Sequence, residues 1–178
     1  MADGRLIVLS GIMAAGKSTV AQALAERFAK SAHVRGDHYR RAIVQGRHDM
    51  SRDPTPEALD QLRLRYRLAA STAEHYRHAG FTTVVQDTIL GPMLNEFVAM
   101  IRDRPLSLVV LTPEPGEVAR REEHRSKVGY RTFTPEHLDA VLRTDTPRVG
   151  YWLDSTGLTV TETVDQVLAN LDGAAIIT

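Results

Sequence analysis

The chain has 178 residues, its 22 Lys and Arg balance 22 Asp and Glu, and 43% of its residues are hydrophobic, so we expect one globular domain over residues 1–178. Cysteine is absent, which excludes disulfides, Cys-ligated zinc, iron–sulfur clusters and thiol nucleophiles. The balanced charge and the lack of an apolar run of about 20 residues predict a cytoplasmic protein whose partners include neither nucleic acid nor a membrane.

Short apolar segments alternate with segments of helical periodicity along the whole chain. The expected strands are residues 5–10, 32–36, 82–87, 106–112 and 148–153. The expected helices are residues 17–30, 37–46 and 57–78, one that ends at Met100, and residues 114–128, 135–143 and 161–171. Strands separated by helices predict a parallel sheet that is covered by helices on both faces.

The first strand runs into the sequence GIMAAGKST, residues 11–19, which fits the pattern G-x-x-x-x-G-K-[ST]. In this pattern backbone N–H groups surround a phosphate, the lysine places a positive charge near the β- and γ-phosphates, and the next hydroxyl ligates Mg²⁺. We therefore expect a nucleoside triphosphate and Mg²⁺ here, with Ser18 on the metal and Lys17 also catalytic. The predicted nucleotide-binding residues of the loop are Gly11, Ala14, Ala15, Gly16, Lys17, Ser18 and Thr19.

Asp37 follows the second strand, at the edge of the sheet that faces the phosphate loop. A carboxylate in this place is suited to accept the proton of an attacking hydroxyl, so we expect Asp37 to be a catalytic base that also binds the acceptor. The alternative is a helix N-cap. Arg40 and Arg41 are predicted to bind the acceptor or a phosphate, although an exposed arginine pair on a helix is also ordinary surface.

Asp87 ends the third strand, TTVVQD. A carboxylate at the end of such a strand holds Mg²⁺ directly or through water, so Asp87 is predicted as a metal ligand, with contact to the acceptor as a second role. The alternative is that Asp87 only forms the turn.

The charged helix 114–128 places Arg121 and Arg125 four residues apart on one face. We expect the region of about 114–133 to be a lid that folds over the nucleotide, with both arginines catalytic and Arg121 also on the nucleotide. A solvated helix with i,i+4 ion pairs is the alternative. Near the fifth strand, Arg148 or Trp152 is placed to stack on the base, and Arg148 is the predicted nucleotide ligand, whereas a lone Trp is more often core.

Four segments give the chain a resemblance to small phosphate-loop kinases of the chloramphenicol phosphotransferase type, including capuramycin-type nucleoside-antibiotic phosphotransferases. The segments are Gly11 to Thr19, Gly36-Asp37, Gln86 to Gly91, and Arg121 to Arg125. The resemblance implies the P-loop nucleoside-triphosphate hydrolase fold, an α/β fold with a five-stranded parallel sheet and a helical lid. It also implies Mg²⁺-dependent transfer of the γ-phosphoryl group of ATP or GTP to a hydroxyl of a small molecule, with Asp37 as general base and antibiotic resistance as the result.

Other functions stay open at this point. The chain is also similar to housekeeping metabolite kinases such as gluconate or shikimate kinases, and a nucleotide-binding regulatory protein without phosphotransfer would carry the same loop. Segment 45–78 is rich in arginine, which favours a charged or nucleoside-like acceptor over a neutral one; the arginines are Arg47, Arg52, Arg63, Arg65 and Arg67. Both a monomer and a homodimer are compatible with the sequence.

Overall fold

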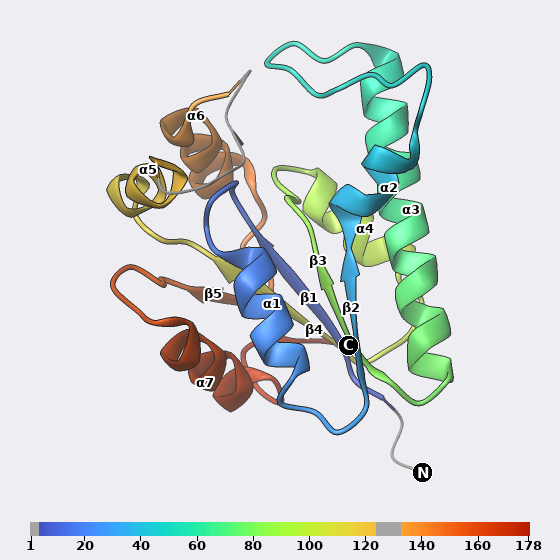
Figure 1. Ribbon diagram of the computed structural model, residues 1–178, viewed down its shortest axis with the longest axis vertical. Helices are drawn as coiled ribbons and strands as arrows, with labels where there is room; N and C mark the ends of the chain where they lie inside the picture. Colours follow the sequence, from blue (N-terminus) through green and yellow to red (C-terminus); the bar gives the residue numbers. More distant parts are fainter. Residues whose placement is uncertain (1–3, 124–132) are drawn as a thin grey trace.

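The computed structural model describes residues 4–123 and 133–178, which form a layered α/β structure (Figure 1). Five strands form a parallel sheet in the order β2-β3-β1-β4-β5, and a short β6 pairs with β4 in the antiparallel direction. The strands are β1 (Leu6–Gly11), β2 (Ser31–Arg35), β3 (Thr82–Gln86), β4 (Leu106–Leu111), β5 (Tyr151–Leu153) and β6 (Ile176–Ile177). The predicted parallel sheet is thus confirmed, and β6 is an addition that the sequence analysis did not predict.

Helices cover both faces of this sheet. They are α1 (Lys17–Ala25), α2 (Gly36–Ala42), α3 (Pro56–His78), α4 (Met93–Met100), α5 (Pro115–Glu123), α6 (Pro135–Ala140) and α7 (Val160–Asn170). Helix α1 packs against α7, whereas α3 packs against α4 and β3. Every residue of β1, β3 and β4 is buried, as is typical of parallel strands enclosed between two helical layers.

Several elements are shorter than the sequence predicted. Helix α1 ends at Ala25 because the chain tightens there into turns in which Arg27 N donates to Leu24 O and Phe28 N to Ala25 O. Helix α2 ends at Ala42, so residues 43–55 form a longer loop than expected. Strand β5 begins only at Tyr151, because Gly150 has a φ of +72° and approaches Leu108 closely.

The long helix α3 has sharply defined ends. Thr55 caps its start by accepting a hydrogen bond from Ala58 N, and a proline follows at the first helical position. At its end Gly80, with a φ of +80°, donates to Arg77 O while Phe81 N donates to Tyr76 O. This is a Schellman motif, completed by an edge-to-face contact between the Tyr76 and Phe81 rings, and it fixes the length of α3.

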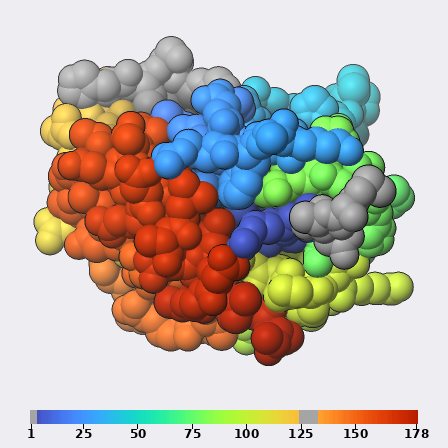
Figure 2. All heavy atoms as spheres, turned by 90° about the horizontal axis from the view of Figure 1, so that it is seen from below, coloured from blue at the N-terminus to red at the C-terminus, as the bar shows by residue number. Residues whose placement is uncertain are grey.

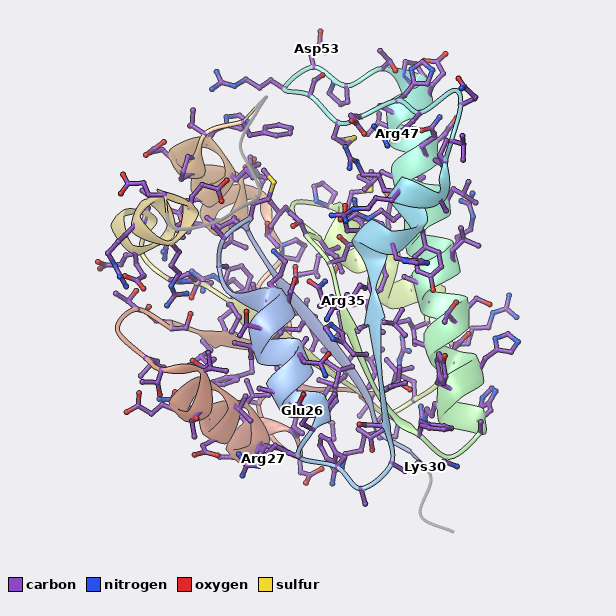
Figure 3. All side chains as sticks on the ribbon, in the orientation of Figure 1. Glu26, Arg27, Lys30, Arg35, Arg47 and Asp53 are labelled. Atoms are coloured by element: carbon purple, nitrogen blue, oxygen red, sulfur yellow. The ribbon has the colours of Figure 1, made fainter. Side chains whose placement is uncertain are left out.

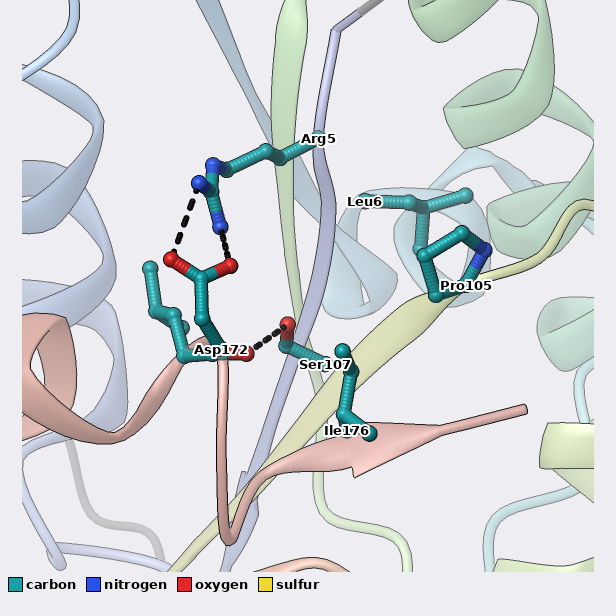
Figure 4. A pocket seen from close by; sticks show the side chains of 7 residues that line it. Arg5, Leu6, Pro105, Ser107, Asp172 and Ile176 are labelled. Atoms are coloured by element: carbon teal, nitrogen blue, oxygen red, sulfur yellow. Dashed lines mark hydrogen bonds and ion pairs between the residues drawn. The ribbon is translucent and has the colours of Figure 1, made fainter.

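The amino-terminal ends of the strands form the end of the molecule opposite the phosphate loop. Seen from this end, residues of the carboxyl-terminal segment cover a large part of the surface (Figure 2). A hollow of about 250 Å³ lies here, lined in part by Leu6, Pro105 and Ile176 and bordered by an ion pair between Arg5 and Asp172 (Figure 4). Within the described residues, the helices are all too short or too polar to cross a membrane.

Candidate active site

The loop after β1 has the backbone of a phosphate cradle. Gly11 has a φ of +144°, and a Cβ at this position would lie 2.7 Å from Leu111 O on β4. Gly16 has a φ of +90°, and Ala14 adopts a φ of +61° although it is not a glycine. Such a conformation costs an alanine about 1–2 kcal/mol, and residues held in it are concentrated at ligand-binding sites. The backbone of this loop, which includes Gly11, Ala14, Ala15 and Gly16, is therefore typical of a ligand-binding loop.

Lys17 lies inside this loop. Its Nζ donates to Gly11 O at 2.9 Å and to Ile12 O at 2.7 Å, and only 8% of the residue is exposed. A lysine folded back on loop carbonyls keeps its charge solvated by protein dipoles and poised next to the cradle. Ser18 and Thr19 lie in the first turn of α1 and are exposed, next to the helix N-terminus where a phosphate is favoured.

Arg121 of α5 reaches across to the phosphate loop. Its Nε donates to Glu117 Oε1 at 2.7 Å, one terminal nitrogen to Ala15 O at 3.2 Å, and the other to Ser155 O at 3.2 Å. A Cβ on Gly16 would lie 3.4 Å from this guanidinium. The arginine thus joins α5, the phosphate loop and the loop after β5.

The loop after β5 holds the start of α5 in place. Thr156 Oγ1 accepts a hydrogen bond from Glu114 N at 2.8 Å, next to the Ser155 carbonyl that binds Arg121. Glu117 orients Arg121 in turn, and its hydrogen bonds with Arg120 and Arg121 lower the pKa of the Glu117 carboxyl. Arg125, the other predicted lid arginine, lies outside the described residues and stays a prediction.

Asp37 lies in the first turn of α2, directly beyond the end of β2. The N-cap of α2 is Arg35, so Asp37 is not the capping residue that its position in the sequence allowed. The Asp37 carboxylate is about 40% exposed and forms ion pairs with Arg41 and, at 3.7 Å, with Arg40. A carboxylate that is accessible from solvent is within reach of the hydroxyl of an acceptor, as a proton acceptor must be.

The registers of the strands set the distance between this carboxylate and the phosphate loop. Arg35 of β2 is level with Gln86 of β3, which is level with Leu9 of β1. Neighbouring strands are about 4.8 Å apart, so β2 and β1 are separated by about 10 Å. The ends of β2 and β1 therefore lie about 10 Å apart, and Asp87 follows the end of β3, the strand between them.

Asp87 is buried, with 2% of the residue exposed, and its carboxylate is bound by the guanidinium of Arg65. Arg65 of α3 donates from Nε to Asp87 Oδ2 at 2.7 Å and from a terminal nitrogen to Oδ1, and Thr88 N donates to Oδ1 at 2.6 Å. Burial opposes the charge on Arg65, but the attraction of Asp87 raises the pKa of Arg65 above its ordinary value. The pair therefore joins α3 to the end of β3.

The two predicted Mg²⁺ ligands, Ser18 and Asp87, are not equally suited to bind the metal. Ser18 is exposed beside the phosphate loop, and a hydroxyl there fits the usual coordination of Mg²⁺ by a protein oxygen together with phosphates and water. Both oxygens of Asp87 accept hydrogen bonds from Arg65, so contact with Mg²⁺ through water suits this carboxylate better than direct coordination, and its place at the metal stays a prediction. Within residues 4–123 and 133–178, no group of three or more His, Asp or Glu side chains is arranged to hold a metal.

The structure does not bring all of the predicted residues together. Arg40 lies beside Asp37 but binds Asp49 of the 43–55 loop through two hydrogen bonds of 2.8 and 2.6 Å. Arg148 precedes β5 and stacks over the Trp152 ring, 4.1 Å from its centroid, on the strand that β4 separates from β1. Its contact with a nucleotide base stays a prediction.

Sequence reasoning missed two features of this site. Arg65 was recognised only as one arginine among several, and its bond with Asp87 has no local signal because the residues lie 22 positions apart. The second is Gly36, where a Cβ would lie 1.8 Å from Asp87 Oδ2. The adjacent Gly36-Asp37 dipeptide was the available clue, since a glycine before a functional carboxylate often marks a close approach of another group.

Comparisons with known proteins agree with this geometry. A family model described as AAA domain matches residues 6–147. No curated protein sequence matches the chain. Among solved structures, a sugar kinase from Janibacter sp. has a TM-score of 0.70 at 17% identity and covers 97% of this chain and 96% of its own. A tunicamycin resistance protein from Deinococcus radiodurans has a TM-score of 0.68 at 20% identity, over 98% of this chain and 99% of its own.

A third solved structure was determined with ligands. The APS kinase of Mycobacterium tuberculosis, in complex with AMPPNP and APS, has a TM-score of 0.69 at 17% identity and covers 96% of this chain and 99% of its own. At these identities the likeness concerns the fold. The α/β fold with a phosphate loop is thereby shared over nearly the full length of this chain.

Proposed function

The chain belongs to the AAA domain family, and from this premise we propose that it transfers the γ-phosphoryl group of ATP or GTP to a hydroxyl of a small molecule. The observation that carries the proposal is the cradle after β1, with Lys17 folded inside it and Arg121 reaching over it from α5. The shared fold with solved kinases supports the same class of reaction.

In the proposed reaction the cradle binds the β- and γ-phosphates through its N–H groups. Lys17 moves its hydrogen bonds from Gly11 O and Ile12 O to phosphate oxygens, and Arg121 exchanges Ala15 O for the transferred group. Each exchange replaces a neutral acceptor by a charged one, and charge-assisted hydrogen bonds are roughly twice as strong. Both cations then stabilise the charge on the equatorial oxygens of the transferred phosphoryl group.

Asp37 takes the proton of the attacking acceptor hydroxyl, and the hydroxyl oxygen bonds to the γ-phosphorus as the bond to the leaving diphosphate breaks. Arg41, which forms an ion pair with Asp37, orients the carboxylate. Ser18 would hold Mg²⁺, which would supply positive charge to neutralise the phosphates of the bound nucleotide. Arg125 joins Arg121 in the proposed lid.

An antibiotic is our proposed acceptor, and resistance by phosphorylation is the proposed biological role. A housekeeping kinase for a metabolite uses the same loop, base and lid, so only the acceptor separates these two functions. A nucleotide-binding regulatory protein would use the loop without Asp37.

The test is mass spectrometry of a panel of antibiotics and metabolites after incubation with the protein, Mg²⁺ and either ATP or GTP. We expect one compound to gain one phosphoryl group, and Asp37→Asn to lower kcat by at least about 100-fold while nucleotide affinity is unchanged. Asp60→Asn is the matched control, since Asp60 is exposed on α3 and approaches only Arg63, at 3.9 Å. Full turnover in Asp37→Asn would remove the base from the mechanism.

A further inference from the structure

Charged side chains surround the place where the proposed acceptor would lie. They come from the end of β3 and from α2, α3 and the 43–55 loop, and we call them the acceptor-side ion-pair cluster. Its members are Asp37, Asp49, Asp87, Arg40, Arg41, Arg47 and Arg65.

Each arginine of this cluster already has a carboxylate partner. Arg65 binds Asp87 through both oxygens, and Arg41 binds Asp37. Arg40 binds both oxygens of Asp49 and also approaches Asp37, so it links the 43–55 loop to α2. The hydrogen bonds from Arg40 lower the pKa of Asp49, and Arg65 contributes to the same shift, which shows that the charges of the cluster act on one another.

The other arginines of this region do not add a strong anion site. Arg63 of α3 binds Glu96 of α4, and Arg35 contacts Gln22 of α1, on the opposite face of the sheet. Arg67 lies two residues beyond Arg65 and is exposed on another side of α3. Arg52 is exposed on the 43–55 loop, and among the described residues no carboxylate partner of it is found.

Four arginines and three aspartates leave one surplus positive charge in the cluster. We assign this surplus charge to Arg47, because Arg47 shares Asp49 with Arg40. The Arg47 Nε lies 3.6 Å from Asp49 Oδ1, and 41% of the Arg47 side chain is exposed. Arg47 and the tip residue Asp53 both lie on the 43–55 loop (Figure 3). A charge in this position is screened by water and salt, so it attracts an anion only weakly.

From this arrangement we infer that the acceptor is an uncharged polyhydroxylated molecule, and that carboxylate-, sulfate- or phosphate-bearing acceptors are selected against. The inference rests on the proposed function. An anionic acceptor group that binds Arg40, Arg41 or Arg65 must take that arginine away from its carboxylate, and displacing Asp87 would leave a buried, uncompensated charge. The same anion would lie next to the ionised Asp37. A hydroxyl group, in contrast, hydrogen-bonds to these ion pairs without breaking them.

This inference reverses the preference that the arginine-rich sequence suggested. Counting arginines favoured a charged acceptor, but the sequence does not show that the aspartates at 37, 49 and 87 converge on the same place. The carboxylates neutralise the arginines that were expected to bind an anion.

The first test compares acceptors that differ only in charge. Glucitol and gluconate differ at one terminal carbon, and shikimate is compared with its methyl ester. With ATP or GTP and Mg²⁺, we expect kcat/KM for the neutral member of each pair to exceed that for the anion by at least about tenfold. A preference for gluconate or for shikimate would overturn the inference.

The second test releases Arg40 from its carboxylate partner and measures acceptor binding in the absence of turnover. Asp49→Asn removes the carboxylate that holds Arg40. Asp53→Asn removes the same charge from the same loop without releasing an arginine, because among the described residues only the Asp53 carbonyl is engaged, by Ser51. Gluconate and glucitol are titrated calorimetrically into the full chain in the presence of AMPPNP. We expect Asp49→Asn to bind gluconate about tenfold more tightly than the parent, with glucitol unchanged and the gain lost at high salt.

Equal gluconate affinity in Asp49→Asn and Asp53→Asn would refute the inference, since it would show that Arg40 is not the masked anion site. The two proposals fail in different ways. If AMPPNP does not bind, or if ATP and GTP are never consumed with any acceptor, the proposed phosphotransfer fails. The comparison of Asp49→Asn with Asp53→Asn then still decides whether the cluster masks its arginines.

Discussion

At the scale of single residues, Gly36 is the position in the site where a side chain has the least room. A Cβ here would lie 1.8 Å from Asp87 Oδ2, and the carboxylate cannot retreat because Arg65 and Thr88 N hold it. We expect Gly36→Ala to lower the free energy of unfolding by about 3 kcal/mol, as overpacking does, when measured by urea denaturation. Gly116→Ala is the control, since nothing lies within 4 Å of its Cβ. Equal stability of the two variants would contradict the close approach.

The environment of His33 predicts how the stability of the fold depends on pH. Burial, reinforced by Arg35, lowers the pKa of His33 to about 4, and its Nε2 is buried without a hydrogen-bond partner among the described residues. In the unfolded chain His33 binds a proton below about pH 6.5, whereas in the folded chain His33 stays neutral until the pH falls to about 4. Stability contributed by neutral His33 is therefore present above pH 6.5 and is lost as the pH falls towards 4.

The size of this effect is about 1–2 kcal/mol, because the ring is only partly buried and solvent reduces the full shift. It is measured as the free energy of unfolding at several pH values between 4.5 and 7. His33→Gln should flatten the dependence in this window. An unchanged slope in His33→Gln would assign the effect to other groups.

At the scale of elements, the pair of Arg65 and Asp87 joins α3 to β3. Removing one partner leaves the other as a buried charge, so we expect Arg65→Met to cost about 3–5 kcal/mol of unfolding free energy. The double variant Arg65→Met with Asp87→Leu should recover part of this loss, because two apolar side chains replace the two charges. Arg67→Met, on an exposed side of α3, should have little effect. A double variant as unstable as the sum of its single variants would contradict the pairing.

The elements themselves were largely predictable, because their signals are local. Strand β1, the phosphate loop and the capped start of α6 follow from an apolar run, a glycine pattern and a Thr-Pro step, each confined to a few residues. Two-residue β6 has no such signal, since its pairing with Leu106 and Ser107 of β4 supplies the reason for its conformation.

The candidate site was predictable only in part, for the same reason. Lys17 and Asp37 lie where parallel topology places the ends of β1 and β2, which the order of elements determines. The bonds from Arg65 to Asp87 and from Arg40 to Asp49 depend on how α3 and the 43–55 loop pack, and no spacing in the sequence encodes those contacts. The arginine count alone therefore favours a charged or nucleoside-like acceptor, whereas these ion pairs support our inference of an uncharged one.

At the scale of the whole molecule, nucleotide binding should stabilise the fold. A ligand present at 100 times its Kd adds about 2.7 kcal/mol, which for a chain of this size raises Tm by about 5–10 °C. We expect this rise with Mg²⁺-ATP or Mg²⁺-GTP in differential scanning fluorimetry. Lys17→Ala should abolish the rise, and Lys30→Ala, whose Nζ binds Ala79 O far from the loop, should retain it. An identical rise in both variants would place the nucleotide elsewhere.

The stacking of Arg148 on Trp152 has a practical consequence for observing the protein in solution. Trp152 is the one tryptophan of the sequence, so the intrinsic emission of the molecule arises from a single indole. This indole donates to Val149 O and lies three residues before Ser155, whose carbonyl binds Arg121. In the proposed reaction Arg121 exchanges Ala15 O for the transferred group, and we expect this movement to change its contact with the Ser155 carbonyl and hence the surroundings of the indole. The fluorescence of Trp152 would then be a label-free optical signal for movement of the proposed lid.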